Sequence, residues 1–219
     1  IALLIIGGAK VADKLGLLDA LVPRTAALAV VGAMAFTVLR DAGKMEHIGD
    51  SLYDPCGAPA VARLVAQTAT NGVALILPTD FVAAPAKGEI DDRLAHSVTV
   101  ENAIPDCMAG MDIGPASAQR LAAAIDRLGP GRRVLWNGPA GLFEAGPQWA
   151  AGTAAIVQAL VRAAARGAHV VVAGGDSAHA VARFAGPAPH GLHVSTGGGA
   201  TLELLEGRAL PGLVHLGMA

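Results

Sequence analysis

Residues 1–14 read IALLIIGGAKVADK: an apolar, strand-like run ends in two glycines and leads into a helical pattern that carries Lys10 and Lys14. Glycine lets a backbone approach an anion closely, and the first turn of a helix offers unpaired N–H groups. Two lysines four residues apart lie on one face of a helix. The stretch therefore predicts a strand, a tight turn and a helix start that together bind phosphate. The alternative is a pair of solvated lysines on a surface helix.

The composition indicates a globular chain with a large apolar core. Of the 219 residues, 53% are hydrophobic and 16% are charged, which predicts a single domain over residues 1–219. The net charge of −2 and the scattered basic residues exclude nucleic acid as an expected partner. No apolar run approaches the roughly 20 residues that span a bilayer, so we expect no membrane contact. Two cysteines without metal-type spacing favour the cytoplasm.

Short aliphatic runs alternate with alanine-rich helical stretches along the chain, which is typical of a parallel sheet covered on both faces. We expect a three-layer, Rossmann-like α/β fold with a parallel sheet of about six strands. The predicted strands are residues 2–6, 28–31, 73–77, 98–100, 133–136, 169–173 and 192–195. The predicted helices are residues 11–21, 34–42, 59–70, 116–128, 148–166, 178–185 and 201–206. Residues 81–106 are the least regular and are predicted to form a surface loop or hairpin beside the main sheet.

Glycine-rich turns follow five of the predicted strands, at residues 7–8, 32–33, 137–141, 174–177 and 197–199. In doubly wound sheets, ligands bind at the carboxyl ends of the strands. One such turn is commonly a loop solution, but five at one sheet edge indicate a ligand that lies against backbone. The chain has no Walker-type glycine-lysine-serine/threonine motif, and no dinucleotide fingerprint follows its first strand. The site therefore differs from both of those nucleotide-binding types.

Three further features each have two interpretations. Asp176, at a predicted helix start, either holds Mg²⁺ together with substrate phosphates or caps the helix. Residues 195–199 form either a second anion site at a helix start or a flexible turn. Glu144 either accepts hydrogen bonds from a ribose or is a solvated loop carboxylate.

Taken in order, these motifs resemble the C-terminal, nucleotide-binding domain of phosphoglycerate kinase. The resemblance is collinear across nearly all of the chain. It rests on the blocks GGAKVADK (7–14), MAFT (34–37), LPTDFV (77–82), GMDIGP (110–115), WNGPAGLFE (136–144), GGDS (174–177) and STGGGATLELLEG (195–207). The resemblance implies reversible phosphoryl transfer from 1,3-bisphosphoglycerate to ADP, which gives 3-phosphoglycerate and ATP in glycolysis and uses Mg²⁺.

The resemblance also implies roles for individual residues. The implied catalytic residues, at the transferring phosphoryl group, are Lys10, Gly175 and Gly198. Asp176 would anchor Mg²⁺ and Glu144 would contact the ribose. Residues implied to surround the nucleotide phosphates are Lys10, Lys14, Asn137, Gly174, Gly175, Asp176 and Ser177. Those implied to line the adenine slot are Gly8, Gly32, Gly110, Met111, Pro139 and Leu142.

Two departures from the family pattern modify these expectations. Val31 and Ala33 flank Gly32 where the family has three glycines, which predicts a narrower or reshaped adenine slot. The family's phosphoglycerate-binding domain would precede Ile1, so we expect this chain to be the nucleotide half of a longer, monomeric enzyme and to be inactive alone. The alternative is a catalytically inactive, nucleotide-binding regulatory module.

Overall fold

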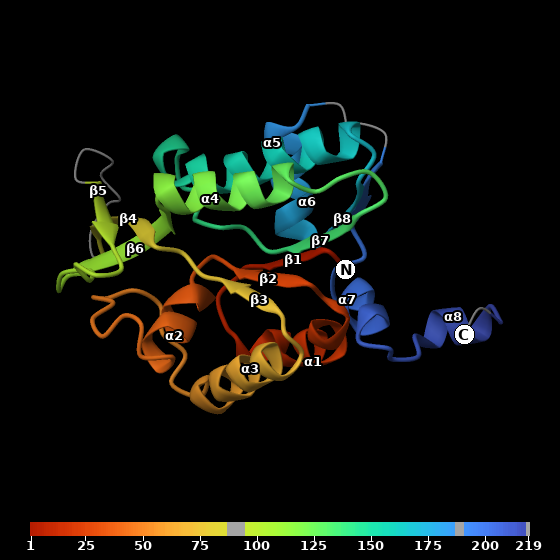
Figure 1. Ribbon diagram of the computed structural model, residues 1–219, viewed down its shortest axis with the longest axis horizontal. Coiled ribbons are helices and arrows are strands. Elements are labelled where there is room, and N and C mark those ends of the chain that lie inside the picture. The colour runs from red at the N-terminus through yellow and green to blue at the C-terminus, as the bar shows by residue number, and fades with distance from the viewer. Residues whose placement is uncertain (87–94, 187–190, 218–219) are drawn as a thin grey trace.

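The computed structural model describes residues 1–86, 95–186 and 191–217. A six-stranded parallel sheet forms its centre, in the strand order β3-β2-β1-β7-β8-β9. All four residues of β1 are buried, because β1 lies in the interior of the sheet with helices on both of its faces (Figure 1). The strands are β1 (Leu3–Ile6), β2 (Ala27–Val30), β3 (Ala74–Ile76), β7 (Arg133–Asn137), β8 (His169–Ala173) and β9 (Leu192–Ser195). The predicted fold class is confirmed.

Helices cover the sheet in two layers (Figure 1). One layer contains α1 (Leu15–Leu21), α2 (Met34–Asp41) and α3 (Ala58–Thr70), and the other contains α4 (Pro115–Asp126), α5 (Ala151–Ala165) and α6 (Gly175–Phe184). Helix α7 (Gly198–Leu205) contacts α1, and α8 (Pro211–His215) follows it. Short 3-10 turns lie at Ala12–Lys14, Val22–Arg24 and Pro147–Trp149. None of the helices in the described ranges is long and apolar enough to cross a membrane.

A second, antiparallel sheet lies at one end of the molecule, in the order β5-β4-β6 (Figure 1). It consists of β4 (Asp80–Pro85), β5 (His96–Thr99) and β6 (Met108–Ile113). The predicted strand at 98–100 belongs here and not to the parallel sheet, and its antiparallel pairing with β4 confirms the hairpin interpretation of residues 81–106. Strands β4 and β6 were not predicted individually. Their small residues, such as Ala83 and Gly110, give no β-branched run, and these two residues pair across a long sequence interval. Residues 87–94 of the predicted loop lie outside the described residues.

The first predicted helix is also corrected. Residues 12–21 form a 3-10 turn and then α1, and Lys14, the last residue of the turn, has a backbone outside the α-helical region (φ −109°, ψ 0°). Lys10 precedes both elements, so the two lysines do not share a helix face. Two other helices, α6 and α7, begin three residues earlier than predicted because glycines form their first turns.

Two buried aspartates tie the small sheet to the helix layer. The Asp80 carboxylate accepts hydrogen bonds from the backbone N–H groups of Ala116 (3.0 Å) and Ser117 (2.7 Å), in the first turn of α4. The Asp112 carboxylate accepts one from Gly152 N–H (2.7 Å), in the first turn of α5. Both carboxylates thus cap helices from a neighbouring sheet, and they fix β4 and β6 at the edge of the candidate site.

Candidate functional site

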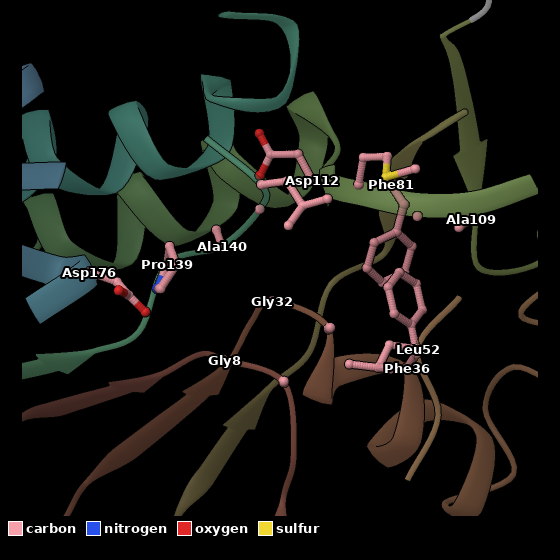
Figure 2. Close-up of a pocket in the computed structure, with 16 residues that line it drawn as sticks. Gly8, Gly32, Phe36, Leu52, Phe81, Ala109, Asp112, Pro139, Ala140 and Asp176 are labelled. Carbon is pink, nitrogen blue, oxygen red and sulfur yellow. The ribbon is translucent and has the colours of Figure 1, made fainter. Parts of the chain in front are cut away.

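A cavity of about 320 Å³ opens between the carboxyl ends of the parallel strands and the small sheet (Figure 2). All of the residues predicted for the adenine slot line it, and Asp176 lies at one end of it: the predicted lining residues are Gly8, Gly32, Gly110, Met111, Pro139 and Leu142. The apolar lining and the glycine backbone make a slot suited to a flat heterocycle.

The turns after β1 and β7 cross in close contact below the cavity. A Cβ on Gly7 would lie within van der Waals overlap of the carbonyl oxygens of Gly138 and Pro139, and one on Gly138 would overlap the backbone of Gly7. Gly32 has a φ of +68° and faces Gly8 and Pro139 with no room for a Cβ. Three of the predicted glycine turns therefore meet at one place. They can do so because their glycines have no Cβ and the space holds backbone atoms alone.

An aromatic pair closes the other end of the cavity. The ring centroids of Phe36 and Phe81 lie 4.4 Å apart, and a Cβ on Gly110 would overlap the Phe36 ring. Leu52 is half exposed beside them (Figure 2). No role for these three side chains was predicted. The available signal was that Phe36 and Phe81 lie in two of the matched blocks of a chain with only 3% aromatic residues.

Asp112 is a buried acid in the cavity lining that sequence reasoning also missed. Besides Gly152, the N–H of Ile113 donates to its carboxylate, at 2.9 Å. Burial raises the pKa of Asp112 to about 7, and the two backbone hydrogen bonds oppose that rise. Gly141 and Gly152 leave no room for a Cβ beside this carboxyl group. Asp112 therefore joins β6, the 139–142 turn and α5 at the back of the slot.

The cationic side of the site is built on Lys14. Its Nζ donates to Asn137 Oδ1 at 2.6 Å, and Asn137 Nδ2 donates to the Ala173 carbonyl at 2.7 Å. Burial lowers the pKa of Lys14, and the negative charges of Asp13, Asp176 and Glu206 oppose that effect. Asn137 is buried and hydrogen-bonded to β8, so its amide holds the Lys14 ammonium group in position. Lys10 is exposed and lies outside the cavity lining.

The start of α6 lies directly beside these groups. Gly138 N–H donates to the buried Ser177 Oγ at 2.7 Å, and a Cβ on Gly174 would contact the Asn137 amide. Gly174 has a φ of +98° and precedes α6, whose first turn, like that of any helix, offers N–H groups without an intrahelical acceptor. Gly175 and Asp176 are exposed there. The structure thus brings together four residues predicted for the phosphate side, which are Lys14, Asn137, Gly174 and Ser177.

Asp176 is suited to a metal that takes most of its ligands from a substrate. Within the described ranges, no group of three acidic, histidine or cysteine side chains could hold a metal ion by itself. Mg²⁺ is commonly held by one or two carboxylates together with phosphate oxygens and waters. The exposed Asp176 carboxylate at the end of the cavity fits this pattern.

Gly198 and Glu144 also lie outside the cavity lining. Gly198 begins α7 with a φ of +51°, and the end of β9 approaches α6 through a hydrogen bond from Gly174 N–H to the Ser195 carbonyl (3.3 Å). Glu144 is exposed and lies two residues after Leu142. Its Oε1 accepts a hydrogen bond from His179 Nδ1 at 2.7 Å.

Comparisons with known proteins agree on one family. A family model described as phosphoglycerate kinase matches residues 2–208. Phosphoglycerate kinase from Komagataella pastoris is 44% identical over 214 residues, which are 98% of this chain and 50% of that protein. The protein of that name from Schizosaccharomyces pombe is 45% identical over the same share of both chains. The solved structure of phosphoglycerate kinase from Coxiella burnetii superimposes with a TM-score of 0.84 at 32% identity, over 98% of this chain and 52% of that one. The chain thus spans about half the length of the curated relatives it matches.

Proposed function

Because the chain belongs to the phosphoglycerate kinase family, we propose that residues 1–219 form one nucleotide-binding unit that supplies the ADP/ATP half of this kinase. The observation that carries the proposal is the glycine-lined cavity with Lys14 and the start of α6 beside its open end. An apolar slot next to a cluster of N–H groups and a cation matches a molecule with a flat base at one end and phosphates at the other.

In this proposal the adenine lies in the cavity between Gly32, Met111 and Leu142, with the aromatic pair at its far end. The phosphates extend toward Lys14, Asn137 and the start of α6, where Gly174, Gly175 and Ser177 surround them. Glu144, on the same turn as Leu142, accepts hydrogen bonds from the ribose. The base, the sugar and the phosphates are thus each assigned to a different group of residues in this proposal.

Asp176 would hold Mg²⁺ together with the nucleotide phosphates. When bound, the ion would neutralise phosphate charge during transfer. The residues of this chain act through position and charge: Lys10, which is exposed beside the site, and the backbone of Gly175 and Gly198 would stabilise the charge of the transferring phosphoryl group. Holding these groups in fixed positions is the main protein contribution to phosphoryl transfer.

The second substrate, 3-phosphoglycerate or 1,3-bisphosphoglycerate, is proposed to bind to a part of the kinase outside this sequence. Support comes from the relatives, which are about twice as long as this chain. The chain alone would then bind nucleotide without turnover. Its monomeric state and its cytoplasmic location remain predictions.

Calorimetry with Mg-ADP tests the nucleotide site. The wild-type chain is expected to bind, and Lys14→Ala and Asp176→Ala are each expected to weaken binding at least tenfold. Lys44→Ala, which removes an exposed lysine in a loop away from the cavity lining, is the matched control and should bind as the wild type does. Equal binding by all four proteins would contradict the residue assignments.

A coupled assay distinguishes the kinase from the regulatory module. The chain alone is expected to show no turnover of 3-phosphoglycerate and ATP, and turnover is expected after the addition of the phosphoglycerate-binding half of a relative. Mg-ADP binding without turnover in the combined sample would favour the regulatory module. Turnover by the chain alone would refute the need for a second half.

A further inference from the structure

The geometry points to His179 as a positioning residue that holds Glu144 in place for the sugar and so makes the site selective for ribose over 2′-deoxyribose. This inference rests on the proposed function, in which Glu144 contacts the ribose. His179 lies on α6, one turn after Asp176, and carried no role in the sequence interpretation.

The contact between the two side chains leaves one carboxylate oxygen available. His179 Nδ1 lies 2.7 Å from Glu144 Oε1, and an ionised carboxylate only accepts, so Nδ1 carries the hydrogen. Within the described part of the chain, this is the one hydrogen bond made by the Glu144 side chain, which is 62% exposed. Glu144 Oε1 is therefore held by His179, and Oε2 of this exposed side chain can accept a hydrogen bond from a ligand.

Further contacts restrict the imidazole, whose side chain is 55% exposed, and the turn that carries Glu144. The His179 ring packs edge-on against the Phe143 ring, with centroids 5.4 Å apart. Phe143 is buried, and its carbonyl accepts a hydrogen bond from Arg183 Nη1 at 2.7 Å. An exposed ion pair alone contributes little, since two mobile side chains lose entropy when they pair. Here the histidine ring also packs against a buried ring, so part of that loss occurs without Glu144.

Helix α6 thus carries residues for both the phosphate side and the sugar side of the proposed nucleotide site. Helix α6 carries Asp176 in its first turn, on the phosphate side, and His179 and Arg183 on the following turns. The segment that carries Glu144 is also attached to the cavity lining, because the Leu142 N–H donates to the Met111 carbonyl (2.8 Å). The segment 142–144 is therefore held between β6 and α6. The spacing between the Asp176 and Glu144 carboxylates is set by this helix.

A positioned carboxylate discriminates between sugars more strongly than a mobile one. If the Glu144 carboxylate is ordered before binding, its hydrogen bond to a ribose hydroxyl costs little additional entropy. A sugar without the 2′-hydroxyl cannot use that oxygen. Removal of His179 should consequently reduce the affinity for ribonucleotide and leave the affinity for 2′-deoxynucleotide nearly unchanged.

The test measures dissociation constants of Mg-ADP and Mg-2′-deoxy-ADP by calorimetry. His179→Ala is expected to weaken ADP binding at least fivefold and 2′-deoxy-ADP binding less than twofold, with an unchanged melting temperature. His179→Asn, whose side-chain N–H lies near the position of Nδ1–H, should restore ADP binding to within twofold of the wild type. In a Glu144→Ala background, His179→Ala should have no further effect. The control is His169→Ala, because His169 lies at the start of β8, at the end of the strand away from the site.

Each other outcome overturns a defined step. If Glu144→Ala abolishes the preference for ribose but His179→Ala changes both ligands equally or neither, His179 does not position Glu144, and the proposed function stands. If Glu144→Ala leaves the preference intact, Glu144 does not contact the sugar and the inference fails with that assignment. If the wild-type chain binds neither ligand, the proposed function itself is refuted.

Discussion

Gly7 and Gly138 bring the turns after β1 and β7 into direct backbone contact under the cavity. Their lack of a Cβ is a requirement of space: the atoms that a Cβ would meet are carbonyl groups of the facing turn, which cannot rotate away as a side chain could. The base slot depends on this contact, because Pro139 and Gly8 are the next residues along each turn and both line the cavity.

The Gly7→Ala variant tests this contact. We expect it to lower the free energy of unfolding by about 2 kcal/mol, since the added methyl group forces the two turns apart. Mg-ADP binding should weaken at least tenfold. Urea unfolding and calorimetry measure the two effects. Gly129→Ala is the matched control, because a Cβ there meets no atom within 4 Å; a Gly7→Ala protein as stable as that control would disprove the close contact.

The buried carboxyl group of Asp112 predicts a pH dependence of stability. Its folded-state pKa of about 7 lies above the unfolded value of about 4. Between these values the folded chain keeps a proton that the unfolded chain has lost. Asp112 therefore lowers the free energy of unfolding by up to about 1.4 kcal/mol per pH unit as the pH rises from about 4 to about 7.

Urea unfolding at several pH values from 4.5 to 8 measures this slope. Asp112→Asn should remove the Asp112 contribution and flatten the curve, since the amide does not titrate. Asp106→Asn, an exposed aspartate in the turn before β6, should keep the wild-type slope. Parallel curves for the wild type and Asp112→Asn would show that Asp112 is ionised across this range.

The small sheet and the helix layer are joined by carboxylates instead of by a shared strand. Asp80 satisfies two N–H groups at the start of α4, and no side chain within that helix caps it. The chain thus uses β4 to complete a helix that begins about thirty residues later. This arrangement couples the position of the aromatic end of the cavity, which includes Phe81 next to Asp80, to the helix layer.

Asp80→Ala is expected to destabilise the fold by about 2 kcal/mol, because the buried Ser117 N–H and the partly buried Ala116 N–H lose their acceptor and the helix start loses a negative charge. Thermal and urea unfolding measure the change. The control is Asp106→Ala, which removes an exposed carboxylate and should change stability by less than about 0.5 kcal/mol. A small effect of Asp80→Ala would mean that water caps α4 equally well.

The parallel sheet was predictable from sequence, whereas of the small sheet only a loop or hairpin over residues 81–106 was predicted. Buried parallel strands such as β1 and β8 are short aliphatic runs, which stand out in any window of the chain. Strands β4 and β6 contain alanine, glycine and aspartate, and their identity depends on pairing with each other across a long interval. Local patterns carry no information about such pairing.

The same contrast applies to the site. The glycines of the slot lie directly after strands, so topology alone places them at one edge. Phe36 and Asp112 reach the slot from a helix and from an unpredicted strand, so their roles depend on tertiary packing. Lys10 and Lys14 have the same local pattern, yet among the described residues a side-chain partner from another segment, Asn137, holds Lys14 alone.

The strand order places the site where the chain reverses direction across the sheet. From β1 the chain proceeds to β2 and β3 on one side, and β7, β8 and β9 extend the sheet on the other. The crevice lies where the two directions diverge, as in other doubly wound sheets. A nucleotide there contacts turns from both halves, through Gly8 and Gly32 on one side and Pro139 and Leu142 on the other.

The hydrogen bond between Lys14 and Asn137 joins residues that are 123 positions apart. Closing so long a loop is slow, and the slot does not exist until β7 has paired with β1. Mg-ADP therefore has no early intermediate to bind, and its stabilisation should appear in the unfolding rate. Saturating Mg-ADP is expected to slow unfolding in stopped-flow experiments and to leave the refolding rate within twofold of its value without ligand. The bound nucleotide would then slow unfolding of the finished fold without assisting its formation. Faster refolding with Mg-ADP would show that the pairing of β1 with β7 comes early.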